Sequence, residues 1–144
     1  MHVPFRGAQQ TIPAMLAGDV TFAVDNLASY ISQINSGTMR ALAVTSAGRW
    51  PSLPEVPTMA EAGVKDFVVT SWAAYALPSA TPRPIVDKVS AMHKEIAADE
   101  GMQKRFLAAG ARILHSTPAE AKAFAAKETK MWEEVVRLSG LTPQ

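Results

Sequence analysis

A chain of 144 residues, 48% hydrophobic and 19% charged, suits one soluble globular domain and not a disordered segment. Its 14 basic and 13 acidic residues leave a net charge of +1, and no basic run reaches four residues, which argues against a nucleic-acid binder. The lack of cysteine excludes disulfides and thiolate metal sites, and no apolar stretch reaches the ~20 residues of a membrane-spanning helix.

The chain begins with MHVPF, which has neither the basic start nor the apolar middle of a signal peptide, so composition alone predicts a cytoplasmic chain. The first 45 residues alternate between strand-like and helix-like patterns. The expected strands are 2–5, 20–24 and 40–45, and the expected helices are Gln10–Ala17 and Leu27–Asn35. This order and spacing predict parallel strands joined by right-handed crossovers.

The remaining residues predict one long strand and further helices. Phe67–Leu77 is the longest apolar run and is typical of a strand buried on both faces. Two Thr-x-x-Glu sequences, at 58–61 and 117–120, have the spacing of a capping box. The first predicts a single-turn helix that ends at Gly63, and the second predicts a helix of about twenty residues. The other expected elements are a helix from Thr81-Pro82, a helix to Ala109 and a short strand at 113–114. Together these patterns predict an α/β fold with a mostly parallel sheet flanked by helices.

A candidate ligand site follows from the predicted strand ends, because open parallel sheets bind ligands at the carboxyl ends of their strands. Polar groups gather at three such ends: Asp25, Asn26, Ser29, Thr45, Ser46 and the free N–H groups around Ala8, Gln9 and Gln10. Pro13 fits best in a first helical turn, which places the helix start near Gln9 or Gln10. The positive end of that helix favours a carboxylate or phosphate. A structural alternative stays open: Gly7 makes only a turn, and Asp25 or Asn26 only caps the next helix.

Motifs for nucleotide binding and catalysis are absent from the sequence. It contains neither GxxxxGK[ST] nor GxGxxG, which makes a nucleotide ligand unexpected. No GxSxG or HExxH sequence occurs, and His2, His93 and His115 are far apart in the chain. We therefore expect no enzyme activity, no metal and no cofactor.

Several longer stretches resemble one family of transport receptors. They are VPFRG at 3–7, RALAVTS at 40–46, LPEVPTMAEAG at 53–63, Ser71-Trp72, STPAEAKAF at 116–124 and a Lys-x-Trp at 130–132. Over essentially the whole chain, these stretches closely resemble the solute receptors of tripartite tricarboxylate transporters, also called Bug receptors. The LAVTS and LPEVPTMAEAG stretches are the most specific part of the resemblance.

The resemblance implies a periplasmic binding protein of type II-like fold, with two α/β lobes and a ligand cleft between them. Such receptors hand small organic carboxylates or dicarboxylates to a membrane permease. They hold the ligand carboxylate largely through backbone N–H groups and ordered waters. Carried over to this sequence, the ligand-binding residues are Gly7, Ala8, Gln9, Gln10, Asp25, Asn26, Thr45, Ser71 and Trp72.

By this resemblance the chain corresponds to the C-terminal half of a receptor. Residues 1–66 would then be part of the ligand-binding second lobe, 67–80 an interlobe crossing strand, and 81–144 a C-terminal helical segment with a short strand. An alternative is a stand-alone, non-catalytic interaction module derived from the same fold. We also expect the isolated chain to form a homodimer through apolar helix faces at Ile85, Val89, Met92, Ile96, Phe106 and Leu107.

Overall fold

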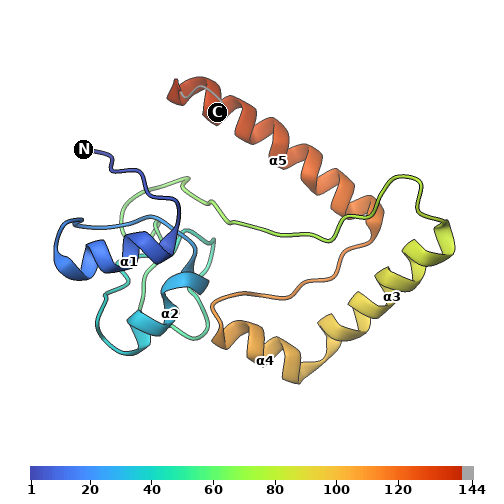
Figure 1. The fold of residues 1–144 in the computed structure, drawn as a ribbon, viewed down its shortest axis with the longest axis horizontal. Coiled ribbons are helices and arrows are strands. Elements are labelled where there is room, and N and C mark those ends of the chain that lie inside the picture. The colour runs from blue at the N-terminus through green and yellow to red at the C-terminus, as the bar shows by residue number, and fades with distance from the viewer. Residues whose placement is uncertain (141–144) are drawn as a thin grey trace. The chain divides into compact units, whose positions relative to one another are not determined.

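The computed structural model describes residues 1–140, and five α-helices form in that part of the chain (Figure 1). They are α1 (Ala8–Ala17), α2 (Leu27–Asn35), α3 (Arg83–Ala98), α4 (Glu100–Ala108) and α5 (Pro118–Ser139). Among the described residues, no helix combines the length and apolarity needed to cross a bilayer.

The chain divides into two compact units. Unit 1 comprises Met1–Ala73 and Gly101–Ile113, and so contains α1, α2 and nearly all of α4. Unit 2 comprises Ala74–Glu100 and the residues from Leu114 onward, with α3 and α5. Unit 1 carries all the residues predicted to bind a ligand.

The helices of unit 1 confirm most of the sequence expectations. α2 has the predicted bounds, and α1 ends as expected before Gly18. Gly18 has φ 84°, a left-handed conformation that costs glycine little, and its N–H bonds to the carbonyl of Met15 at 3.1 Å. The start of α1 differs from the prediction, because the helix begins at Ala8 and places Pro13 inside it instead of in its first turn.

The helices of unit 2 also form close to their predicted positions. α3 begins at Arg83, after Pro82, and carries a proline in its first turn, where a missing N–H costs no helical hydrogen bond. α5 is opened by the expected capping box. The Glu120 amide donates to Thr117 Oγ1 at 3.2 Å, and the Thr117 amide donates to Glu120 Oε2 at 2.8 Å.

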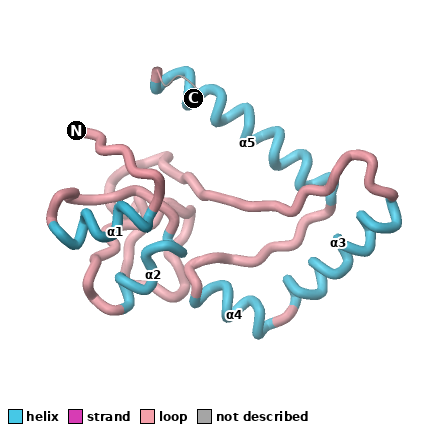
Figure 2. Tube along the Cα trace, in the orientation of Figure 1, coloured by secondary structure: helices cyan, strands magenta, loops and turns pink. Residues whose placement is uncertain are grey.

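The predicted strands do not form within residues 1–140. The segments 2–5, 20–24, 40–45, 67–77 and 113–114 are loops (Figure 2). A ladder requires hydrogen bonds at successive positions of two neighbouring segments, and here only one parallel bridge is made, between Val44 and Thr58. The Val44 amide donates to Pro57 O at 2.8 Å, and the Met59 amide donates to Val44 O at 3.0 Å, so 40–45 pairs with a turn and not with 2–5 or 20–24.

Without a ladder, the apolar side chains of these segments stay in contact with water. Phe22, Val24 and Leu42 are 65%, 77% and 68% exposed. The expectation that Phe67–Leu77 is buried on both faces is therefore wrong for this structure, in which that run is exposed at nearly every position. The helical part of the α/β prediction is confirmed, and no sheet forms in the part of the chain that the structure describes.

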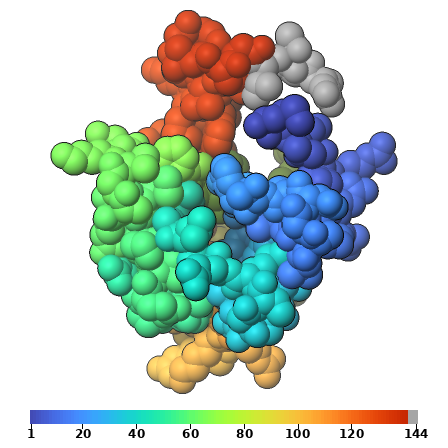
Figure 3. All heavy atoms as spheres, turned by 90° about the vertical axis from the view of Figure 1, so that its left-hand side faces the viewer, coloured from blue at the N-terminus to red at the C-terminus, as the bar shows by residue number. Residues whose placement is uncertain are grey.

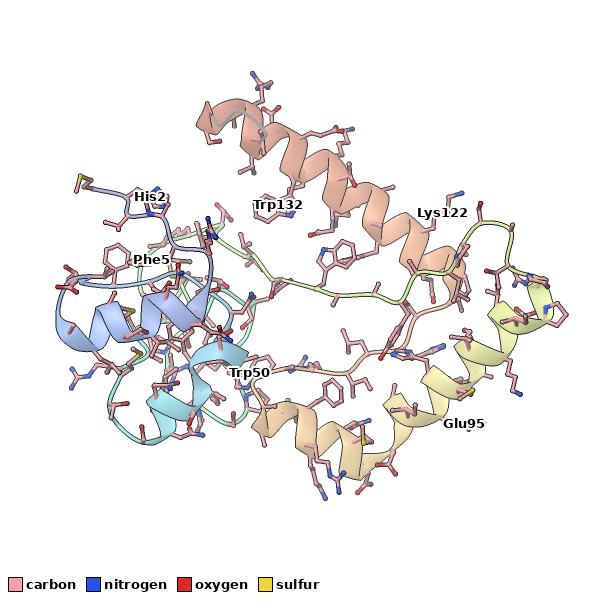
Figure 4. All side chains as sticks on the ribbon, viewed as in Figure 1. His2, Phe5, Trp50, Glu95, Lys122 and Trp132 are labelled. Carbon is pink, nitrogen blue, oxygen red and sulfur yellow. The ribbon has the colours of Figure 1, made fainter. Side chains whose placement is uncertain are left out.

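The core of unit 1 is small and lies between α2 and the proline-rich loop that follows residue 50. Ile31 of α2 packs with the buried Leu53 and Val56. Five half-buried residues cover this cluster: Leu27, Ile34, Ala41, Val44 and Trp50. Trp50 is labelled in Figure 4. The Arg112 guanidinium lies over its indole ring, with Cζ 5.7 Å from the ring centre, which is a favourable cation–π geometry. These contacts fix α2, and with it the segment Asp25–Tyr30, within unit 1.

Candidate functional site

All nine residues expected to bind a ligand lie in unit 1. On the face shown in Figure 3, the N-terminal segment and α1 (blue), α2 (cyan) and the residues up to about 70 (green) are all visible. Ala8 and Thr45 are half-buried. The other seven are exposed: Gly7, Gln9, Gln10, Asp25, Asn26, Ser71 and Trp72.

The N-terminus of α1 presents free backbone donors. Gly7 is the N-cap residue, and its φ of 149° with ψ of 177° is a backbone conformation that glycine adopts far more readily than other residues. No side chain caps the helix, and Gly7 O accepts from the amides of Gln10 and Thr11 at 3.0 and 3.2 Å. Within the described residues, the amides of Ala8 and Gln9 have no recorded partner. Two N–H groups at the positive end of a helix are suited to bind an anion.

The Gln10 side chain is partly committed inside the protein. Its Oε1 accepts from the Arg6 amide at 3.2 Å, so the side chain folds back over the first turn of α1. The carbonyl end of the amide is thereby occupied. The NH2 end donates and so suits an anion.

Asp25 has internal donors on both carboxylate oxygens. Oδ1 accepts from the Asn26 amide at 2.7 Å, and Oδ2 accepts from the Tyr30 hydroxyl at 3.1 Å. Asn26 is the N-cap residue of α2 but makes no side-chain cap bond. The structural alternative is thus not realised for the Asn26 side chain, which leaves its amide available as a donor.

Thr11 and Tyr30, which the sequence interpretation did not single out as site residues, connect the first turns of the two helices. Both side chains are buried, with exposed fractions of 9% and 8%. The Thr11 and Asp25 side chains both interact with the Tyr30 phenol, and Thr11 Oγ1 also donates to Gly7 O at 3.3 Å. Burial, together with the bond to Asp25, raises the pKa of Tyr30. The buried Thr11 and Tyr30 side chains therefore meet between the first turns of α1 and α2.

Thr45 belongs to a second group of contacts. Its carbonyl accepts from the Val69 amide at 3.0 Å, which brings the segment before Ser71 and Trp72 next to the end of 40–45. Ser46, also expected near the site, donates its hydroxyl to Gly48 O at 2.7 Å and is thus committed to its own turn. The hydrogen bonds recorded in residues 1–140 join Gly7 to Gln10 and, separately, Asp25 to Asn26, and they do not join Thr45, Ser71 or Trp72 to either pair.

Comparison with known proteins identifies the family. Residues 1–141 match the family described as the tripartite tricarboxylate transporter family receptor. The chain belongs to this family. The resemblance carried by the sequence stretches is confirmed, and the family is one of receptors and not of enzymes.

A curated relative is BugT of Bordetella pertussis, which is 33% identical over 138 residues, covering 96% of this chain and 42% of that protein. A second, an uncharacterised protein of a Pseudomonas species encoded between tcbD and tcbE, is 34% identical over 138 residues, covering 94% of this chain and 41% of its own length. The chain therefore spans less than half the length of these relatives.

Solved structures of receptors share the backbone course of this chain. Rpa4515 of R. palustris with adipate superposes with a TM-score of 0.90 at 30% identity, covering 99% of this chain and 48% of the other. MatC of Rhodopseudomonas palustris with bound malate superposes at 0.80 and 28% identity, covering 93% and 47%. The periplasmic binding protein BugD superposes at 0.79 and 30% identity. The course of the chain is thus that of a periplasmic binding protein, although its extended segments form no ladder within residues 1–140.

Proposed function

We propose that this chain is the solute-binding part of a periplasmic receptor for small organic carboxylates that serves a tripartite tricarboxylate-type transporter. The observation that carries the proposal is the free N-terminus of α1, tied through Thr11 and Tyr30 to the N-terminus of α2. Adipate and malate, the ligands in two related structures, are both dicarboxylates, which agrees with an anion site of this kind.

In the proposed site, a ligand carboxylate accepts hydrogen bonds from the amides of Ala8 and Gln9. The side-chain NH2 groups of Gln10 and Asn26 add donors from either side. The Asp25 carboxylate would repel an anion, but its two internal hydrogen bonds stabilise its charge and hold it in place. Asp25 is accordingly an orienting group for α2 and not a direct contact of the carboxylate.

The second group of residues, Thr45, Ser71 and Trp72, is proposed to contact the rest of the ligand. In this proposal residues 1–66 belong to one lobe of a two-lobed receptor, 67–80 cross between lobes, and 81–144 form the C-terminal helical segment. One lobe leaves the ligand open to water on one side, where hydrogen bonds to the ligand compete with bulk water. We expect the chain alone to bind acids with dissociation constants of about 1 mM or weaker.

The test is a titration of the 15N-labelled chain with adipate and malate, followed by amide chemical shifts. The expected result is saturable shifts at Ala8, Gln9 and Asn26, and none with hexane-1,6-diol, the uncharged analogue of adipate. Replacing Asn26→Ala should weaken binding about fivefold to tenfold, because a side-chain donor to a charged group is lost. Asn35→Ala, at the other end of α2, is the matched control and should leave binding unchanged.

Absence of saturable shifts with either acid, or shifts confined to residues outside unit 1, would contradict this proposal.

The alternative of an interaction module is favoured by a different observation, the exposed apolar residues of α3. Ile85, Met92 and Ile96 are 51%, 52% and 42% exposed along one helix face. We propose that the isolated chain forms a homodimer through this face. Phe106 and Leu107 of α4 are half-buried in unit 1, so they contribute less to it than the sequence led us to expect.

A further inference from the structure

Tyr30 is the residue on which the connection between the two helix N-termini depends. Its ring is 8% exposed, and its hydroxyl donates to Asp25 Oδ2 at 3.1 Å. Thr11, the other buried polar residue of this network, interacts with the same hydroxyl from α1. A single phenol therefore contacts both the helix that presents the anion donors and the Asp25 carboxylate before α2.

The hydrogen bond from Tyr30 determines what the Asp25 carboxylate can do. Oδ1 accepts from the adjoining Asn26 amide at 2.7 Å and Oδ2 accepts from the Tyr30 hydroxyl at 3.1 Å, so each oxygen of this exposed carboxylate already has one internal donor. A carboxylate with both oxygens bonded internally attracts a ligand cation less strongly than one with a free oxygen. Removing the phenol hydroxyl would leave Oδ2 as an acceptor beside an exposed site.

We propose that Tyr30 is a positioning residue that tunes the charge preference of the site, because its hydrogen bond to Oδ2 weakens the attraction of Asp25 for a ligand cation. This inference rests on the proposed function, since it assumes that ligands bind at the N-termini of α1 and α2. The site then prefers a carboxylate over an ammonium group at the same position. Selectivity against ligands of similar shape that carry an ammonium group is the consequence.

Two ligands of equal chain length test the proposal. Adipate carries a carboxylate at each end, and 6-aminohexanoate, which has the same number of carbons, carries a CH2–NH3+ group in place of one carboxylate. We expect the wild-type chain to bind adipate at least tenfold more tightly. In Tyr30→Phe, adipate binding should weaken about fivefold to tenfold while 6-aminohexanoate binding stays equal or strengthens, so that the affinity ratio falls at least fivefold. A purely structural role of Tyr30 would weaken both ligands together and leave the ratio unchanged.

A second variant separates charge from packing. Asp25→Asn keeps an acceptor for the Tyr30 hydroxyl but removes the negative charge. In this background, Tyr30→Phe should no longer alter the adipate to 6-aminohexanoate ratio, because no carboxylate is left to release. Amide spectra of each variant report whether the fold is kept, and Asp25→Asn alone, which keeps the Tyr30 ring, tests the contribution of the carboxylate if Tyr30→Phe is poorly folded.

The outcomes distinguish this inference from the proposed function. Adipate binding by the wild-type chain with an unchanged ratio in Tyr30→Phe overturns the role of Tyr30 and leaves the receptor proposal intact. The same ratio change in the Asp25→Asn background also overturns it, since the effect would not pass through the carboxylate. No saturable binding of either ligand by the wild-type chain overturns the proposed function, and this inference with it.

Discussion

Arg49 Nε lies 2.9 Å from Glu61 Oε2, an ion pair that closes the proline-rich loop between them. The Arg49 guanidinium also donates to Pro54 O at 2.8 Å. Glu61 accepts from the Thr58 amide at 2.7 Å, and its own amide donates to Thr58 Oγ1 at 3.2 Å. The predicted capping box is thus confirmed, although it opens only a hydrogen-bonded turn, marked by the Ala62 amide bonded to Thr58 O at 3.0 Å, and not a helix.

The Glu61 carboxylate makes stability depend on pH. Hydrogen bonding to Arg49, followed by that to the Thr58 amide, lowers the pKa of Glu61 below its usual 4.5. A lowered pKa in the folded state means a contribution to stability that is present above pH 4.5 and is lost as the pH falls through the folded-state pKa. We expect Glu61→Gln to be slightly less stable than wild type to urea at pH 7, and the difference to shrink towards pH 3. Both residues of the pair are about half exposed, so the effect should also weaken in high salt.

The matched control for this prediction is Glu55→Gln in the same loop. Glu55 makes no recorded ion pair among the described residues, so its replacement should leave the pH dependence of unfolding as in wild type. A Glu61→Gln variant whose stability difference from wild type is the same at pH 7 and pH 3 would contradict the prediction.

Replacing Gly110 with alanine should lower the free energy of unfolding strongly, because Gly110 lies against the first turn of α2. It has φ +75°, and a Cβ there would lie 2.9 Å from both Cα and N of Ala28. Gly37 has a similar φ of +74° with open space around it, so Gly37→Ala isolates the backbone cost of about 1–2 kcal/mol. We expect Gly110→Ala to exceed that cost by about 1–3 kcal/mol, from overpacking against backbone. Urea unfolding of both variants measures the difference, and equal losses would show that α2 yields to the added methyl group.

The capping box of α5 predicts a local loss of stability when its threonine is removed. Thr117→Ala removes the acceptor of the Glu120 amide and should cost about 1 kcal/mol. Thr129→Ala is the control, because that hydroxyl donates to Ala125 O within the same helix and alanine is the better helix former. Far-UV circular dichroism during urea unfolding reports both, and an equal effect of the two variants would argue against a capping role for Thr117.

The helices could be predicted from the sequence because their signals are local. α2 has the expected bounds since its apolar spacing and the glycine beyond it act over a few residues. The strands could not be predicted in the same way, since a ladder depends on what lies beside it. The segment 20–24 has the β-branched and aromatic residues of a strand, but no neighbour offers it a ladder within residues 1–140, and Phe22 and Val24 remain exposed.

The candidate site was predictable in part for a related reason. The free N-terminus of α1 follows from glycine before a helix, a local signal that the structure reproduces. Tyr30 has the spacing of an apolar residue on the buried face of α2, in line with Leu27 and Ile31. Its hydroxyl also donates to Asp25, a contact that the apolar spacing does not reveal. A tyrosine one turn into a helix, five residues after an aspartate, is a signal that could have indicated the bond.

Self-association is the prediction with the largest expected effect. Water contacts the α3 face formed by Ile85, Met92 and Ile96, and burial of one such side chain contributes about 1.5–3 kcal/mol. Pairing this face in a closed dimer recovers several kcal/mol, comparable with the stability of a small domain. Light scattering coupled to size exclusion should show a mass near twice 15.4 kDa at high concentration. Met92→Gln should shift the chain toward monomer, whereas Lys94→Gln, on the opposite side of α3, should not. Met, Lys and Gln have similar helix propensities, so neither substitution changes the stability of the helix itself by much. A clean 15.4 kDa species at high concentration would mean that the helices are satisfied within one chain and that the dimer does not form.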